Sequence, residues 1–242
     1  MKYAIIAAGE GSRLRQEGIS EPKPIVKVAG ERLIDRLMRI FMANGATQIA
    51  VVCNQLTDRV SNHLRDIEKN GLQGQQIPLK FVEKTTPSSM HSFFEVSRYV
   101  GDAPFCMTTV DTIFREEEFG RYIAAFKQAT ADGYDGLMGV TDYIDDEKPL
   151  YVGTDGDMGI SGFFDEPSGC TYISGGVYGL TPKAIETLRR CISRGESRMR
   201  NFQRALVAEG QRLKAWPFSK VLDIDHASDI AKAEEFLGQK PL

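Results

Sequence analysis

The sequence predicts an α/β fold in three layers, in which a mostly parallel, mixed sheet is covered by helices on both faces. Short apolar runs typical of buried strands alternate with amphipathic helical spacings from the first residues onward. Between residues 136 and 180 the pattern changes to strands separated by polar turns, which adds antiparallel strands. No linker, repeat or low-complexity segment divides the 242 residues, so we expect a single domain over 1–242.

In the first half, apolar runs and helical spacings follow one another in order. Residues 5–8 predict a buried strand, and apolar spacing predicts a helix over 33–43 that ends at Asn44-Gly45. Three acidic residues at 116–118 suit the positive end of a helix dipole, so a helix is expected to begin there. Further strands are expected at 49–53, 79–82 and 105–110, and further helices around 60–67 and 90–99.

In the second half, strands are expected first and helices later. Thr181 is expected to cap a helix that has Pro182 at its first position. A last helix is expected to end at Gly238. Strands are expected at 136–140, 151–152, 160–164, 173–180, 213–216 and 221–224, and the remaining helices at 199–209 and 227–237.

Composition and charge exclude several classes of protein. The chain is 42% hydrophobic and 26% charged with a net charge of −3, and it has no block of basic residues, so no nucleic-acid partner is expected. No apolar run is long enough to cross a bilayer, and the first residues form a strand rather than a targeting segment. The four cysteines have no paired spacing that would indicate zinc or a disulfide framework. We therefore expect a cytoplasmic protein without membrane partners.

The loop after the first strand points to phosphate chemistry. Gly9 and Gly11 allow backbone N–H groups to approach an anion, and Arg13 and Lys23 supply positive charge nearby. Lys23 lies between two prolines and is therefore expected to be extended. Asp111, Asp223 and Asp225 also fall at or near the carboxyl ends of strands, where open sheets of this kind have their sites.

Two common phosphate motifs do not fit this loop. A P-loop requires Lys-Ser or Lys-Thr at a fixed distance after its first glycine, and neither pair occurs there. A dinucleotide-binding loop requires a third glycine, which would allow close packing of the helix against the strand, and Leu14 follows Arg13 instead. A dinucleotide-dependent oxidoreductase is therefore kept only as a rival interpretation.

Three successive segments resemble the nucleotidyltransferases that activate sugar phosphates and related alcohol phosphates, the NDP-sugar pyrophosphorylase-like family. Residues 7–14 read AAGEGSRL, residues 21–30 read EPKPIVKVAG, and Leu33-Ile34 follows at the expected distance. Weaker similarity continues through residues 109–111, 174–178 and 222–225. The resemblance implies a three-layer Rossmann-like nucleotidyltransferase fold, with a nucleotide-binding half (1–115) and an acceptor-binding half (116–242).

The resemblance also implies a reaction in which an NTP and a phosphorylated alcohol, such as a sugar 1-phosphate, give an NDP-linked product and pyrophosphate. Positioning and charge neutralisation dominate such chemistry. We expect Arg13 to hold the departing pyrophosphate and Lys23 to stabilise the α-phosphate. Nucleotide contacts are expected from Ala7, Ala8, Gly9, Glu10, Gly11 and Ser12, and from Ser88 and Ser89 in the segment after the third strand. The two serines serve equally well as a helix cap.

Phosphate transfer of this kind requires Mg²⁺, which prefers carboxylate oxygens. We expect Asp111, Asp223 and Asp225 to bind it, since Asp223 and Asp225 would lie on one face of a short strand. The alternative is that one of the latter two caps the last helix.

The acceptor side departs from the family pattern. Where sugar-nucleotide enzymes often carry a lysine for the acceptor phosphate, this chain has Glu166, and Lys27, Arg198 and Lys220 are candidate replacements. Glu166 would suit a cationic acceptor. Gly175 and Tyr178 are further acceptor candidates, although an aromatic residue at strand spacing is more often part of the core.

Two alternatives to a sugar-phosphate enzyme stay open. Residues 223–225 and 89–93 resemble CTP-dependent phosphocholine-type cytidylyltransferases, and the missing lysine is also compatible with a catalytically idle relative that binds nucleotide and acts in regulation. The sequence does not decide the base, the acceptor or whether the chain forms a homo-oligomer.

Overall fold

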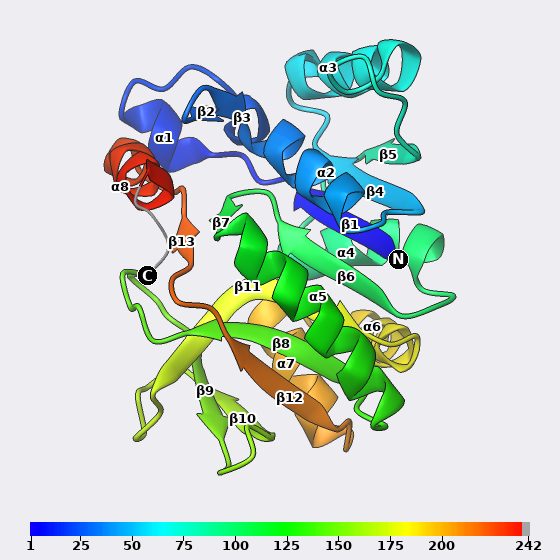
Figure 1. The fold of residues 1–242 in the computed structure, drawn as a ribbon, viewed down its shortest axis with the longest axis vertical. Helices are drawn as coiled ribbons and strands as arrows, with labels where there is room; N and C mark the ends of the chain where they lie inside the picture. The colour runs from blue at the N-terminus through cyan, green and yellow to red at the C-terminus, as the bar shows by residue number, and fades with distance from the viewer. Residues whose placement is uncertain (239–242) are drawn as a thin grey trace.

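Nine strands form one sheet in residues 1–238, which the computed structural model describes (Figure 1). They are β1 (Lys2–Ala7), β4 (Gln48–Cys53), β5 (Leu79–Glu83), β6 (Phe105–Thr109), β8 (Gly136–Thr141), β9 (Tyr151–Thr154), β10 (Ile160–Phe164), β11 (Tyr172–Leu180) and β12 (Leu213–Pro217). Their order is β10-β9-β11-β6-β1-β4-β5, with β8 beside β11 and β12 beside β8. Neighbours among β5, β4, β1 and β6 pair in parallel, whereas β11 runs antiparallel to β6, β8 and β9. The predicted mixed sheet is confirmed.

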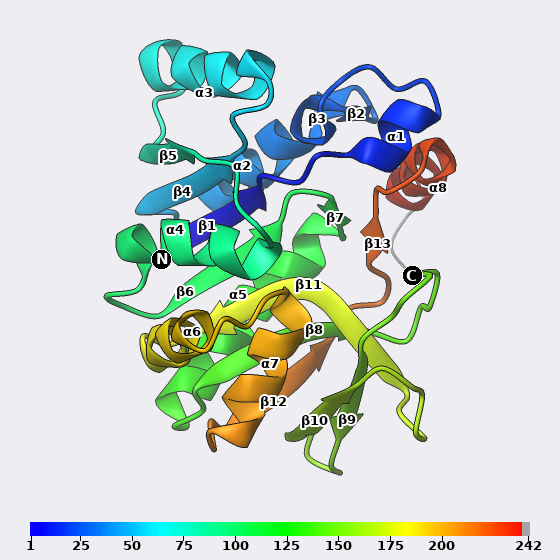
Figure 2. The same ribbon diagram turned by 180° about the vertical axis from the view of Figure 1, so that it is seen from behind.

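Helices cover both faces of this sheet, which gives the predicted three layers. Figure 1 shows one face and Figure 2 the other. The first face carries α2 (Leu33–Ala43), α3 (Asp58–Asn70), α5 (Glu116–Ala131) and α8 (Ala227–Gly238), and the second carries α4 (Ser89–Val100), α6 (Lys183–Ser193) and α7 (Met199–Ala208). None of the helices in the described range has the length and hydrophobicity that a membrane span requires.

The central strand β1 shows why the sequence folds this way. Successive side chains of a strand point to opposite faces, so Tyr3 and Ile5 join the apolar cluster on one side and Ala4 and Ile6 join the cluster on the other. All four are at most 6% exposed. A strand buried on both faces must be apolar throughout, and the chain can become polar only where the strand ends.

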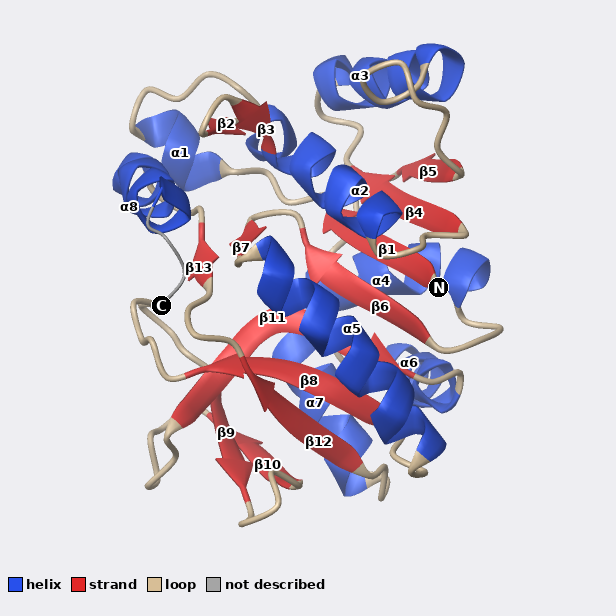
Figure 3. Cartoon of the chain, viewed as in Figure 1, coloured by secondary structure: helices blue, strands red, loops and turns tan. Residues whose placement is uncertain are grey.

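Two short strands bring the end of the chain to the middle of the sheet. β7 (Thr112–Ile113) follows β6 and pairs antiparallel with β13 (Leu222–Asp223), as Figure 3 shows. Beyond β13, the N–H of Ile224 donates to the carbonyl of Asp111 at 3.2 Å. This pairing places residues 223–225 beside the carboxyl end of β6.

Several local predictions were wrong. The strand expected over 221–224 is confined to β13, and the Thr181 hydroxyl has no hydrogen-bond partner among the described residues. Thr181 does not cap α6 with its side chain, because the N–H of Ala184 already donates to its carbonyl at 3.0 Å. The sequence also gave no sign of the short elements around the site, which are α1 (Ser12–Gln16), the 3₁₀ helix η1 (Lys23–Ile25), β2 (Lys27–Val28), β3 (Glu31–Arg32) and β7.

Candidate active site

The glycine loop follows β1 and lines a cavity of about 370 Å³. Gly11 has φ 60°, a left-handed conformation that glycine adopts without strain, and it turns the chain into α1. A Cβ added at Gly9 would meet no atom within 4 Å, so the space above Gly9 is open. Of the predicted nucleotide contacts, Ala8, Gly9, Glu10, Gly11, Ser88 and Ser89 line this cavity. Ala7 is buried in the core, and Ser12 is exposed at the start of α1.

Lys23 lies at one wall of this cavity and is 9% exposed. Its Nζ is 2.8 Å from Asp111 Oδ2 and 2.6 Å from Asp225 Oδ1. Burial alone would lower the pKa of the Lys23 ammonium, but the two carboxylates outweigh it and raise the pKa. The expected extended conformation was wrong: Lys23 begins η1, because the N–H of Ile25 donates to the carbonyl of Pro22 at 2.9 Å and forms a turn.

Arg13 lies on α1 and is exposed. Its Nη1 is 3.0 Å from Asp225 Oδ2, and its Nη2 is 3.4 Å from Glu147 Oε2. Asp225 therefore contacts both predicted phosphate-binding cations, Arg13 and Lys23. A cation that bonds two carboxylates in this way can exchange them for phosphate oxygens when a nucleotide enters.

The three predicted metal-binding aspartates lie together but differ in their surroundings. Burial alone would raise the pKa of Asp111, but the ion pair with Lys23 and a hydrogen bond from Thr109 outweigh it and lower the pKa. Asp223 is exposed on β13, yet desolvation of its carboxyl group, followed by the negative charges of Asp111 and Asp225, raises its pKa to about 8. Among residues 1–238 no three His, Cys, Asp or Glu side chains are arranged to hold a metal ion.

The alternative role of these aspartates as a helix cap is not supported. The N–H groups of Asp225 and His226 donate to Asp229 Oδ2, and that of Ala227 donates to Glu17 Oε2 at 2.6 Å. The start of α8 is thus capped by its own Asp229 and by Glu17 from the end of α1.

The side chains of Ser88 and Ser89, at the start of α4, contact a different helix from the one expected. Ser88 precedes α4 but makes no side-chain cap to it. Instead, the N–H groups of Arg198 and Met199, at the start of α7, donate to Ser88 Oγ and Ser89 Oγ at 3.1 and 3.3 Å. Both serines still line the glycine-loop cavity, and Ser88 Oγ also lies 2.9 Å from His91 Nδ1.

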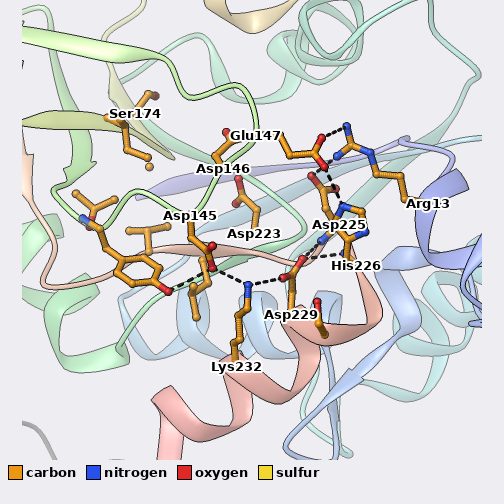
Figure 4. A pocket seen from close by; sticks show the side chains of 17 residues that line it. Arg13, Asp145, Asp146, Glu147, Ser174, Asp223, Asp225, His226, Asp229 and Lys232 are labelled. Carbon is orange, nitrogen blue, oxygen red and sulfur yellow. Dashed lines mark hydrogen bonds and ion pairs between the residues drawn. The ribbon is translucent and has the colours of Figure 1, made fainter. Parts of the chain in front are cut away.

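A second cavity, of about 220 Å³, lies on the other side of Lys23 and Asp225 (Figure 4). Its basic side chains are Arg13, Lys232 and His226, and Asp145 Oδ2 is 2.7 Å from Lys232 Nζ. Carboxylates reach it from the segment after β8, from β13 and the residues that follow, and from α8. They are Asp145, Asp146, Glu147, Asp223, Asp225 and Asp229.

Only one of the three predicted acceptor residues lines this second cavity. Gly175 lines it, next to Ser174. Tyr178 is 4% exposed and packs in the core, so it lies beneath the cleft rather than in its wall. Glu166 is exposed in the turn after β10 and lines neither cavity.

None of the replacement cations lines either cavity. Lys27 is exposed on β2, Arg198 is exposed before α7, and Lys220 lies over the ring of Tyr143 at 3.9 Å. Tyr143 does line the second cavity, so Lys220 lies behind its wall.

Several polar residues of the two cavities were not predicted, and two further unpredicted side chains contact predicted site residues directly. Asn54 directly follows β4 and donates to the glycine loop, and Glu147 contacts Arg13. A signal existed for Asn54, because a polar residue at the carboxyl end of a buried parallel strand occupies the usual position of functional residues. Glu147 lies in a polar segment without periodicity, and only the fold brings it to Arg13.

Fold and site together define an α/β protein with two cavities beside the glycine loop and Asp225, lined by basic side chains and carboxylates. A family model described as nucleotidyl transferase matches residues 2–240. The chain belongs to the nucleotidyl transferase family. This membership contradicts the dinucleotide-dependent oxidoreductase alternative.

The proteins compared with this chain have low sequence identity to it. A Synechocystis UTP–glucose-1-phosphate uridylyltransferase is 30% identical over 73 residues, which is 30% of this chain and 19% of that protein. The chain thus spans only about a fifth of that relative. The inositol-1-phosphate CTP transferase of T. maritima has a TM-score of 0.76 at 22% identity, and the CTP:phosphocholine cytidylyltransferase of Streptococcus pneumoniae has 0.75 at 18%; both alignments cover 98% of each chain. These two structures confirm the predicted fold.

Proposed function

We propose that this chain transfers a nucleoside monophosphate from an NTP to a phosphorylated small-molecule acceptor, such as a sugar 1-phosphate, and releases pyrophosphate. One observation carries the proposal. Lys23 bridges Asp111 and Asp225 at the boundary between the glycine-loop cavity and the second cavity. An α-phosphate beside Lys23 would therefore face the donor cavity on one side and an incoming acceptor on the other.

The proposed roles follow from charge. Attack of one phosphate oxygen on another phosphate brings two anions together, so positive groups must neutralise the charge that accumulates. Lys23 is buried and held at two points, which makes it a fixed charge beside the reacting phosphorus. Arg13 is about half exposed and lines the second cavity, where it contacts Asp225, the residue that also contacts Lys23; from there its planar guanidinium would bind the departing pyrophosphate.

Mg²⁺ fits two of the three predicted aspartates. Mg²⁺ is usually bound by one or two carboxylates together with waters and substrate phosphates, so a cluster of three protein ligands is not required. Asp111 and Asp223 suit this role, because the mutual repulsion that helps raise the pKa of Asp223 would be relieved by a cation between them. When bound there, Mg²⁺ would supply charge neutralisation and orientation of the phosphates. Both carboxylate oxygens of Asp225 are instead engaged, Oδ1 by Lys23 and Oδ2 by Arg13, whereas Lys23 contacts Asp111 through Oδ2 alone.

The acidic second cavity favours one more specific candidate, a CTP-dependent phosphocholine-type cytidylyltransferase. Of its six carboxylates, Asp145, Asp229, Glu147 and Asp225 pair with Lys232 or Arg13. Within the cavity these four carboxylates share only one lysine and one arginine, and Asp146 forms no ion pair with a cation in the described part of the chain. Asp223 adds little charge near neutral pH, because its pKa is raised to about 8. An acceptor that carries its own positive charge would offset this excess of negative charge.

Pyrophosphate release tests the proposed function. Each of the four common NTPs would be incubated with Mg²⁺ and a panel of acceptors that includes hexose 1-phosphates, inositol 1-phosphate and phosphocholine. We expect at least one pair to release pyrophosphate at a rate that depends on both substrates. Nucleotide binding without any pyrophosphate release would support the catalytically idle regulatory alternative. Because NTPs are its donors, we also propose that the chain acts in the cytoplasm, without nucleic-acid or membrane partners.

A further inference from the structure

Asn54 is a buried polar residue whose hydrogen bonds converge on the glycine loop. It directly follows β4 and is 7% exposed. Its Nδ2 donates to the carbonyl oxygens of Ala8 and Gly9, each at 3.3 Å, while its Oδ1 accepts from the N–H of Leu56 at 3.1 Å. One side-chain amide thus joins the ends of two neighbouring parallel strands, β1 and β4.

The hydrogen bonds from Asn54 also determine the direction of the N–H groups of Gly9 and Glu10. In a planar trans peptide the C=O and the N–H point in opposite directions, and the described residues contain no cis bond. When the carbonyls of Ala8 and Gly9 face Asn54, the N–H groups of Gly9 and Glu10 must face away from it. The glycine-loop cavity is lined by Ala8, Gly9 and Glu10 but not by Asn54, so these N–H groups face the cavity.

We propose that Asn54 is a positioning residue that aims the Gly9 and Glu10 N–H groups at the triphosphate of the donor. The inference rests on the proposed function, since it takes the glycine-loop cavity as the triphosphate site. Glycine at position 9 would otherwise leave these two peptide planes free to rotate. A buried amide is costly to keep away from water unless its hydrogen bonds are made, and here Nδ2 donates to the glycine loop while Oδ1 accepts from Leu56.

Two variants separate positioning from simple packing. Asn54→Asp keeps the size and the acceptor toward Leu56 but replaces the donor with an oxygen that repels the two carbonyls. Asn54→Ala removes both. We expect the affinity for inorganic tripolyphosphate with Mg²⁺, measured by titration calorimetry on the full chain, to fall about tenfold in Asn54→Ala and further in Asn54→Asp. The KM for the NTP should rise in parallel, whereas the KM for the acceptor should stay unchanged.

Asn44→Ala is the matched control. Asn44 is also a partly buried asparagine whose Nδ2 donates to a backbone carbonyl, that of Ile40 at 2.8 Å, but it ends α2 and lines neither of the two cavities. This control should lower the melting temperature without changing the affinity for tripolyphosphate. An equal loss of affinity in the control and in Asn54→Ala, at matched folded fractions, would overturn the role of Asn54.

A measurement on the unaltered protein covers the case in which both Asn54 variants fail to fold. Addition of tripolyphosphate should shift the backbone amide NMR signals of Gly9 and Glu10 more than those of the neighbouring strand β4. Binding of tripolyphosphate that leaves these two signals in place would refute the inference while leaving the proposed function intact. If the unaltered protein binds neither tripolyphosphate nor any NTP, the proposed function fails first.

Discussion

Lys23 and Asp225 are separated by 202 positions in the chain, yet Lys23 Nζ lies 2.6 Å from Asp225 Oδ1. The contact exists because β13 pairs with β7 immediately after the central strand β6, which returns the end of the chain to the glycine loop. Asp225 Oδ2 extends the contact to Arg13 at 3.0 Å. The two halves of the chain therefore meet through ion pairs at the point where phosphate transfer is proposed.

Lys23→Ala should reduce catalysis far more than it reduces stability. Loss of a fixed cation at the transferring phosphate is expected to lower kcat by about a hundredfold or more. The free energy of unfolding should also fall, by about 1–3 kcal/mol, because Asp111 is left without its charged partner. Pyrophosphate release and urea denaturation measure the two effects.

Lys27→Ala provides the comparison for this variant, since Lys27 is exposed on β2 four positions later. It should leave both kcat and stability near those of the unaltered protein. Full activity in Lys23→Ala would remove this lysine from the proposed mechanism.

Gly9→Ala should weaken substrate binding without loss of stability, whereas Gly11→Ala should lower stability. A Cβ at position 9 meets no protein atom within 4 Å, so Gly9→Ala should fold normally but raise the KM for the NTP by about tenfold or more, because the methyl group occupies the phosphate's space. At Gly11, φ is 60° and the added Cβ would lie 3.2 Å from Lys23 Cβ. Gly11→Ala should therefore lose about 1–2 kcal/mol of stability and also lower kcat.

Melting temperatures and steady-state kinetics on the same two preparations test this contrast. A Gly9→Ala protein that melts early would contradict the open space above Gly9, and one that keeps its affinity for the NTP would contradict the proposal that a phosphate occupies that space.

Much of the fold could be predicted because strands buried on both faces appear as short apolar runs, and helices buried on one face have apolar residues at helical spacing. The helix over 33–43 was predicted with its exact bounds, and Asn44-Gly45 ends it as expected, since Gly45 has φ 73°. The short elements were missed for a physical reason. Two-residue strands such as β7 and β13 contain a single period of the strand pattern, which is too little to recognise, and their pairing depends on tertiary contacts.

Features that depend on tertiary contacts were also missed in the site. Gly9 and Asp111 come just after strands, so the sequence could place them at one sheet edge, whereas Lys23 was recognised from its motif alone. The partners of these residues come from long-range pairing. Neither the Lys23–Asp225 contact nor the Arg13–Glu147 contact has a sequence signal, because each depends on where a loop of the second half crosses the cleft.

Asp223 should make stability depend on pH. The folded chain keeps its proton up to about pH 8, whereas the unfolded chain releases it near pH 4. Unfolding between these values releases a proton, so the free energy of unfolding decreases as the pH rises from about 4 to 8. Asp223→Asn has no such proton, and in EDTA its melting temperature should equal that of the unaltered protein below pH 4 and exceed it increasingly up to pH 8.

Asp157→Asn, at an exposed aspartate in the turn between β9 and β10, serves as the control for this series and should follow the unaltered protein at every pH. A constant difference between Asp223→Asn and the unaltered protein from pH 4 to 8 would show that the Asp223 proton is not held as described.

The effect of Mg²⁺ on stability should also depend on the carboxyl group of Asp223. If Asp111 and Asp223 bind Mg²⁺, addition of Mg²⁺ at pH 8 replaces the repulsion between them with attraction, so the melting temperature of the unaltered protein should rise toward that of Asp223→Asn. The rise should be smaller at pH 5, where Asp223 is protonated and a cation must displace that proton. Asp223→Asn should gain little at either pH. EDTA should abolish pyrophosphate release in the unaltered protein, and turnover that persists in EDTA would rule out the proposed metal.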